Sequence, residues 1–166
     1  MQILLVFLPM FFLISFGNGF IGVPTVFAGD QVRIEDIKVM MSEVGPVVLL
    51  KAHDQVVPIF VDPTVAGSIE GALSGAKFHR PLSHDLMHTI LNAFEGKVTQ
   101  VVIRLKDRTY YGELTISLKG HTQVFDSRSS DAIALAIHFG APIWVGQDVF
   151  EKVGEQVDGE PAPEVL

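Results

Sequence analysis

The first 28 residues of this chain contain no Asp, Glu, Lys, Arg or His, so all 12 basic and all 19 acidic side chains lie beyond them. Residues 3–16 form an apolar run of signal-peptide length, and Val26, Phe27 and Ala28 are small or tolerated residues where a signal peptidase reads. We therefore expect residues 1–28 to be a signal peptide, and the cleaved chain to be exported, periplasmic or secreted, without stable membrane association. Because no Lys or Arg precedes the apolar run, an uncleaved membrane anchor is the alternative.

The charge of the remaining chain is concentrated at its C-terminal end. Of the net charge of −7, residues 148–166 contribute −5, because they hold six acidic residues and one Lys. Residues 30–147 are close to neutral and create no overall field that would hold a polyanion, so any nucleic-acid contact must use a local patch. The chain has no Cys, which excludes disulfides, thiolate zinc sites and Cys nucleophiles.

The sequence predicts one domain over residues 29–153 and an acidic, disordered tail over residues 154–166, where apolar periodicity is lost. The order of its elements predicts an α+β fold with a largely antiparallel sheet, or sheets, and about three main helices. Alternating apolar residues predict strands at residues 32–41, 46–52, 55–61, 97–105, 109–118 and 121–126, with a short one at 143–146. Capping residues and helical periodicity predict helices at residues 63–74, 83–94 and 131–140.

Two polar clusters each place an Arg just before a predicted helix. Arg80 precedes the helix that Ser83 is expected to cap, and Arg128 precedes the helix that Ser129 or Ser130 is expected to cap. The helix dipole disfavours a cation at this end unless an anion offsets it. That anion is either the Asp in the first turn of each helix or a bound phosphate.

If the two helix starts converge, they form an anion pocket flanked by Asp85, Asp126 and Asp131, and the same carboxylates can instead hold a hard divalent cation. His84 is placed to act as a general base near an activated water. His84 and His88 also share a helix face as zinc-binding histidines do, although the intervening Asp is shorter than the Glu of that motif. The structural alternative is that the Asp residues only complement the helix dipoles.

A predicted hairpin combines positive charge with aromatic rings. Arg104, Arg108 and Tyr110 lie on and around it, and this mixture is typical of surfaces that bind single strands, so the three are candidate substrate contacts. An edge hairpin that carries charges against aggregation has the same composition, and this is the alternative interpretation.

Five strings occur along the chain in the order PVVLLK, VVPIFVDPTVAGSIEGAL, RPLSHDLMHTIL, DSRSSDAIALAIHFGAPIWV and QDVFEKVG. In this order they resemble the bifunctional nuclease domain family over roughly residues 32–153. The family motifs fall on Arg80, Pro81, His84 and Asp85, and on Asp126, Arg128, Ser130 and Asp131. Ser129 stands where the family usually has Pro, which leaves the polar set intact.

The resemblance implies an α+β domain that tends to associate and that cleaves both DNA and RNA. We therefore expect a homo-oligomeric nuclease that acts on nucleic acid with the help of Mg²⁺ or Mn²⁺. The alternative is a noncatalytic ligand-binding or assembly domain in which the Arg and Asp motifs are structural. By role, the expected site residues are Arg80, His84, Asp85 and Arg128 for catalysis, Ser130, Arg104, Arg108 and Tyr110 for substrate binding, and Asp85, Asp126 and Asp131 for the metal.

Overall fold

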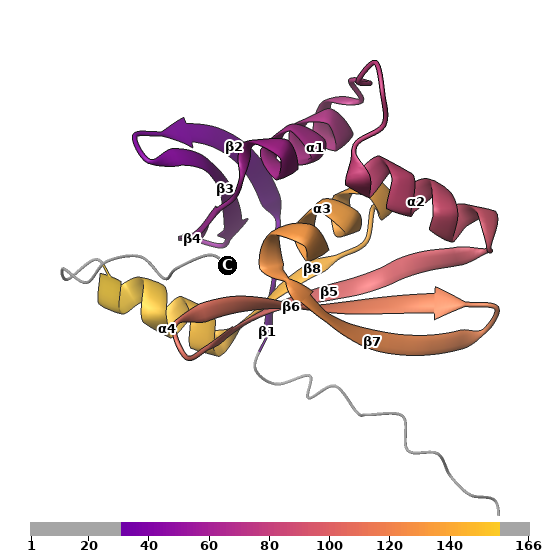
Figure 1. Cartoon of the computed structure of the whole chain (residues 1–166). Coiled ribbons are helices and arrows are strands. Elements are labelled where there is room, and N and C mark those ends of the chain that lie inside the picture. Colours follow the sequence, from indigo (N-terminus) through magenta and orange to yellow (C-terminus); the bar gives the residue numbers. More distant parts are fainter. Residues whose placement is uncertain (1–30, 157–166) are drawn as a thin grey trace, which may run out of the picture.

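The computed structural model describes residues 31–156, so the expected leader and residues 157–166 lie outside the described part of the chain. Within that part the fold is α+β, as the sequence predicts, with four helices and eight strands in two sheets (Figure 1). The strands are β1 Gln31–Arg33, β2 Asp36–Ser42, β3 Gly45–Ala52, β4 Gln55–Phe60, β5 Gly96–Lys106, β6 Thr109–Leu118, β7 His121–Arg128 and β8 Ile143–Gly146. The helices are α1 Pro63–Ser74, α2 Ser83–Ala93, α3 Ser129–Phe139 and α4 Gln147–Gln156.

The larger sheet has five strands in the order β1-β8-β5-β6-β7. Its strands β5, β6 and β7 form the antiparallel meander that the sequence predicts, and β8 pairs with β5 in parallel after the chain crosses over through α3. Asp107 and Arg108 both have positive φ in the tight turn between β5 and β6, a conformation that suits the twist of a two-residue hairpin. β7 is left as an edge strand.

The smaller sheet has three antiparallel strands in the order β2-β3-β4. The single strand expected over residues 32–41 is wrong, because the chain leaves one sheet and enters the other at Ile34 and Glu35. The Ile34 N–H donates to the carbonyl of Ile143 at 2.9 Å, whereas the Glu35 N–H donates to the carbonyl of Lys51 at 2.8 Å. Pro58 lies in the edge strand β4, where its missing N–H is tolerated, as predicted.

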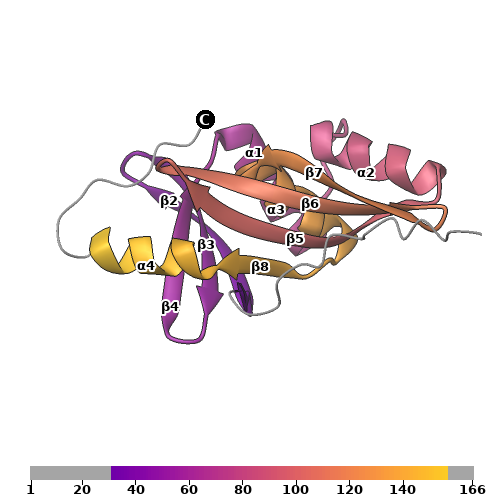
Figure 2. The same cartoon turned by 90° about the horizontal axis from the view of Figure 1, so that it is seen from below.

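Helix α3 packs on the large sheet and contacts both α1 and α2, and α2 also contacts β5, so the three helices lie on one side of that sheet (Figure 1). Figure 2 shows the sheet from the opposite side, which these three helices leave uncovered. All five residues from 132 to 136 in α3 are buried, so this helix forms the centre of the core. Its close approach requires Gly112 of β6, because a Cβ there would lie 2.5 Å from the Cβ of Ala132.

Helix α1 begins at Pro63 as predicted, because the Asp62 carboxylate accepts hydrogen bonds from the first free N–H groups. The cap expected for α2 is wrong. Leu82 is its N-cap residue, and the Asp85 carboxylate reaches back to accept the Leu82 N–H at 2.8 Å. Ser83 thus begins the helix instead of capping it, and the Asp in the first turn satisfies the preceding N–H.

The apolar side chains of α2 do not all face the core. Leu86, Ile90 and Phe94 are 53%, 47% and 63% exposed, and we call these three residues the α2 stripe. Leu91 packs against the core instead, and His84 is buried. The spacing of apolar residues therefore predicted the helix correctly but did not show which of its faces is buried. That face depends on where α3 lies.

Helix α4 is missing from the sequence-based expectation. It begins at Gln147 and continues through Gln156, past the position where the acidic tail was expected to start. Val149 and Phe150 bury their side chains in the core, and the Asp148 carboxylate accepts the Leu105 N–H of β5 at 2.7 Å. Between residues 31 and 156, no helix is long and apolar enough to span a membrane.

Candidate functional site

The starts of three helices converge on one pocket of about 600 Å³, which β6 and β7 close from the sheet side. Its polar lining consists of Asp62, Thr64, Ser83, His84, Asp126, Ser127, Arg128 and Asp131. Its apolar lining consists of Val65, Met87, Leu114, Ile116, Phe125 and Leu135. The N-terminal ends of helices carry partial positive charge, so their convergence favours a negatively charged ligand here.

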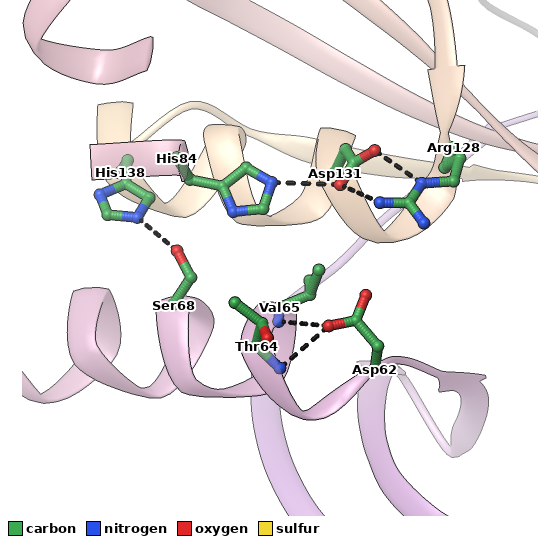
Figure 3. A network of polar contacts seen from close by, with 8 residues as sticks. All are labelled: Asp62, Thr64, Val65, Ser68, His84, Arg128, Asp131 and His138. Atoms are coloured by element: carbon green, nitrogen blue, oxygen red, sulfur yellow. Dashed lines mark hydrogen bonds and ion pairs between the residues drawn. The ribbon is translucent and has the colours of Figure 1, made fainter. Parts of the chain in front are cut away.

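One carboxylate joins a guanidinium and an imidazole in this pocket. Asp131, in the first turn of α3, accepts hydrogen bonds from Arg128 Nε at 2.8 Å and from Arg128 Nη2 at 3.0 Å. Its Oδ1 also lies 3.1 Å from Nε2 of His84 on α2 (Figure 3). The Arg128 side chain is 50% exposed, whereas that of His84 is 7% exposed, so the chain of contacts leads from the surface to a buried imidazole.

The charges of these groups reinforce one another. Partial burial acts to raise the pKa of Asp131, but hydrogen bonds and charge from Arg128, together with His84, outweigh it, so the pKa lies below its ordinary value. The hydrogen bond to Asp131 in turn raises the pKa of Arg128. Asp131 is therefore ionised and can only accept, so Nε2 of His84 carries the proton that it shares with this carboxylate. In the neutral imidazole, this arrangement leaves the acceptor lone pair on Nδ1.

The start of α1 completes the rim of the pocket. Asp62 Oδ1 accepts the N–H groups of Thr64 at 2.9 Å and Val65 at 3.0 Å (Figure 3). Asp62 and Arg128 both line the pocket, and the negative charge of Asp62 adds to the effect of Asp131 in raising the pKa of Arg128. The pocket thus has one guanidinium among several carboxylates.

A second His links the same helices farther along α3. His138 Nε2 lies 3.1 Å from the Ser68 hydroxyl of α1, and His138 Nδ1 lies 3.9 Å from Oδ1 of Asp85 on α2. Burial lowers the pKa of His138, although the neighbouring Asp85 acts against this. Ser68 is 2% exposed and does not belong to the lining of the 600 Å³ pocket, so this Ser, His and Asp set links three helices outside that pocket.

The sequence profile of the bifunctional nuclease domain matches residues 47–158. The chain belongs to the bifunctional nuclease domain family. Two relatives are uncharacterized proteins of Mycobacterium tuberculosis, one from strain CDC 1551 and one from strain H37Rv. Each is 29% identical over 133 residues, which cover 78% of this chain and 79% of the relative. Membership of the family indicates a nuclease-like function and nucleic acid as the general class of partner.

The structure gathers four residues of the two family motifs in the pocket: His84 from the first and Asp126, Arg128 and Asp131 from the second. The starts of α2 and α3 therefore do converge. Arg80 does not join these residues in the pocket, because it lies on the exposed bend before α2 and outside the pocket lining. Of the two motif arginines, only Arg128 therefore belongs to the pocket lining.

Asp85 is also outside the pocket lining, because its carboxylate turns back to the Leu82 N–H and toward His138. Ser130 is 2% exposed, so its expected contact with substrate is wrong. The caps expected from Ser129 and Ser130 are wrong as well, since Arg128 is the N-cap residue of α3 and no side chain caps it. Both serines are buried where α3 starts against the sheet.

The hairpin residues lie away from the pocket. Tyr110 is 5% exposed, so stacking on a base is excluded, and burial without a partner for its hydroxyl raises its pKa. Arg104 Nε lies 3.8 Å from Glu113 Oε1 on the neighbouring strand. Arg108 is exposed in the turn that leads into β6. Arg104 and Arg108 therefore remain candidates only for contacts beyond the pocket.

The carboxylates expected to bind a metal are not gathered into one site. Across residues 31–156, no group of three or more His, Asp or Glu side chains is placed to hold a metal ion. Asp131 is engaged by Arg128 and His84, and Asp85 by Leu82, whereas the Asp126 carboxylate has no hydrogen bond or ion pair within the described residues. The donor set therefore does not fit a resident ion held by all three carboxylates.

Sequence reasoning missed one side of the pocket. Asp62 is identifiable as a helix cap, but no local signal places the start of α1 beside Arg128. The apolar lining from β6 and β7 is equally hidden, because Leu114 and Phe125 fit an ordinary strand pattern. The pairing of Leu114 with Phe125 in the sheet brings them to the pocket together.

Proposed function

We propose that this member of the family is a phosphodiester hydrolase that acts on nucleic acid, and that Arg128, Asp131 and His84 form its reactive centre. The observation that carries the proposal is the continuous set of hydrogen bonds from an exposed guanidinium through an ionised carboxylate to a buried imidazole at the mouth of the pocket. Family membership supplies the class of substrate.

Arg128 is the group that binds the phosphate. Asp131 occupies Nε and one N–H of Nη2, which leaves three of the five guanidinium N–H donors for a phosphate oxygen. The bond to Asp131 fixes the orientation of the guanidinium, so these donors are positioned before substrate arrives. The start of α3 adds the positive end of a helix dipole next to the same phosphate.

His84 is the general base. With Nε2–H held by Asp131, Nδ1 accepts a proton from a water molecule, and the water oxygen forms a bond to phosphorus. The bond from phosphorus to the leaving ester oxygen then breaks, and the imidazolium returns its proton to that oxygen. Asp131 is a positioning residue that also stabilises the imidazolium while it exists.

A requirement for Mg²⁺ or Mn²⁺ stays a prediction of the sequence. No step above passes through a metal, because the three expected carboxylates do not lie together. Cleavage by the purified chain in the presence of excess EDTA, with and without added Mg²⁺ or Mn²⁺, tests the requirement separately from the roles of Arg128 and His84.

The direct test is cleavage of labelled single-stranded DNA and RNA by the wild-type chain and two variants. His84→Gln can keep a donor toward Asp131 but removes the base, so we expect kcat/KM to fall by about 10²- to 10⁴-fold. Arg128→Lys keeps the charge but loses the paired donors, so we expect KM to rise and kcat to fall.

Matched controls are His53→Gln, in the exposed turn between β3 and β4, and Arg33→Lys in β1. Both make the same chemical changes outside this pocket, and we expect wild-type rates. Wild-type rates in His84→Gln or Arg128→Lys would exclude the proposed centre.

The rival function is a noncatalytic binding or assembly domain. The observation that favours it is that Asp131 joins α2 to α3 through His84, as a purely structural ion pair would. In that case, the Arg128 and His84 variants would lower the melting temperature but no cleavage would be measured in the wild-type chain.

A homo-oligomer is the expected state of this domain, and two features of the structure support it. The α2 stripe is exposed, and β7 is an edge strand whose sequence, HTQVFDSR, has no Lys or Pro and whose pairing with β6 has no bulge. Antiparallel pairing of β7 with β7 of a second copy would satisfy its free backbone groups. Light scattering tests the α2 stripe as a contact between copies: Ile90→Lys should lower the mass of the particle, whereas Val44→Lys in an exposed turn should not.

A further inference from the structure

The pocket holds more apolar surface than a phosphate site needs. Val65, Leu114 and Leu135 belong to the core and form its walls, and Met87 and Phe125, which also line the pocket, are 42% and 41% exposed. A phosphate is bound by N–H donors and charge, and apolar side chains add nothing to that contact. Partly exposed apolar residues in a concave site indicate a ligand with an apolar part.

The polar groups around these walls describe the rest of that ligand. Asp62 is an acceptor, and its Oδ2 has no hydrogen bond or ion pair within residues 31–156. Arg128 provides N–H donors at the same rim. The ligand should therefore combine a flat or apolar body, N–H groups at its edge and a phosphate nearby.

We infer that this pocket receives one unpaired nucleobase, which packs against Phe125 and Met87 and directs an N–H group toward Asp62, next to the phosphate held by Arg128. The inference rests on the proposed function and specifies its substrate as single-stranded nucleic acid. A paired base cannot enter, because its edge is already hydrogen-bonded and its faces are stacked in the duplex.

The test measures binding without cleavage, by fluorescence anisotropy in EDTA, so that it does not depend on the reaction or on a metal. The probes are a labelled 12-nucleotide single strand, the same strand with abasic sugars throughout, and the matching duplex. The wild-type chain should bind the intact single strand at least about 5-fold more tightly than the abasic strand, and the duplex weakly.

Phe125→Ala and Met87→Ala should weaken binding of the intact strand by roughly 5- to 100-fold, the range found when a stacking side chain is replaced by Ala. They should leave binding of the abasic strand unchanged, because Arg128 is still present. Met41→Ala, at a 77% exposed position in β2, is the matched control and should bind both strands like wild type. The comparison of the three probes uses the wild-type chain and so remains decisive even where a variant is unstable.

Equal affinity for intact and abasic strands, or equal affinity for single strand and duplex, would overturn the inference. A second result would also overturn it: light scattering shows that Phe125→Ala lowers the mass of the particle, while this variant still binds the intact strand more tightly than the abasic strand. The apolar walls would then be a contact between copies of the chain. The two proposals can fail separately. Base-dependent binding without any cleavage would contradict the hydrolase function, whereas cleavage without base-dependent binding would contradict only the nucleobase pocket.

Discussion

The two His-carboxylate links between α2 and α3 are built from the same residue types but lie in different surroundings. His84 contacts Asp131 at the edge of a pocket and beside a half-exposed Arg, whereas His138 contacts Ser68 and faces Asp85 where three helices meet. Both imidazoles are nearly buried. The comparison teaches that access to a cavity, not the set of residue types, separates a candidate reactive centre from a structural link.

The largest expected difference between the two links concerns their carboxylates. Asp131→Asn removes the charge that fixes the tautomer of His84, so we expect cleavage to fall by about 10²-fold or more. Asp85→Asn should change cleavage by less than about 3-fold, because Asp85 lies outside the pocket and an Asn oxygen can still accept the Leu82 N–H. Equal losses in the two variants would break the comparison.

A smaller effect is expected where Ser68 is changed. Ser68→Ala leaves buried His138 without its hydrogen bond, so we expect the free energy of unfolding to fall by about 1 to 3 kcal/mol while cleavage stays unchanged. Ser74→Ala, at an exposed position near the end of α1, is the matched control. Denaturant unfolding measures the change, and a loss of cleavage in folded Ser68→Ala would show that this link also serves the reaction.

The smallest expected effect is a pH dependence of stability. Burial lowers the pKa of His138 below its ordinary 6.5, so the unfolded chain binds this proton first as the pH falls. Asp85, His88 and His84 face it, and Asp85 limits the shift. Stability should therefore decrease as the pH falls below about 6.5.

His138→Gln should flatten that part of the stability curve relative to wild type. Asp131 has a lowered pKa, so its contribution to stability is present above its ordinary pKa and is lost only as the pH falls through the lowered value. Melting temperatures of both chains between pH 5 and pH 8 separate the two groups, and identical curves would contradict the assignment to His138.

Local chemistry was enough to predict much of the fold. Asp62 followed by Pro63 set the start of α1, and Gly140 with φ of 62° ended α3 as the sequence indicated. The meander β5-β6-β7 followed from alternation around short turns. Helix α4 did not, because its place depends on Asp148 reaching the distant Leu105 N–H.

The candidate site was predictable in part for the same reason. The motifs around His84 and Arg128 carry local signals at two helix starts, and these starts do meet. Sequence patterns did not predict that Tyr110 and Ser130 are buried or that Arg80 lies outside the pocket lining, because packing between elements sets both. The apolar walls of the pocket depend on strand pairing across β6 and β7 and had no distinct signal.

The most direct test of the central claim, that the His84 imidazole at this pocket performs the proton transfer, is chemical rescue. Single-turnover cleavage of a single strand is measured in His84→Ala and in His138→Ala with increasing concentrations of free imidazole. We predict that His84→Ala is nearly inactive and regains activity as imidazole is added, whereas His138→Ala, where folded, cleaves at close to the wild-type rate without it. Full activity in His84→Ala, or rescue confined to His138→Ala, would contradict this account.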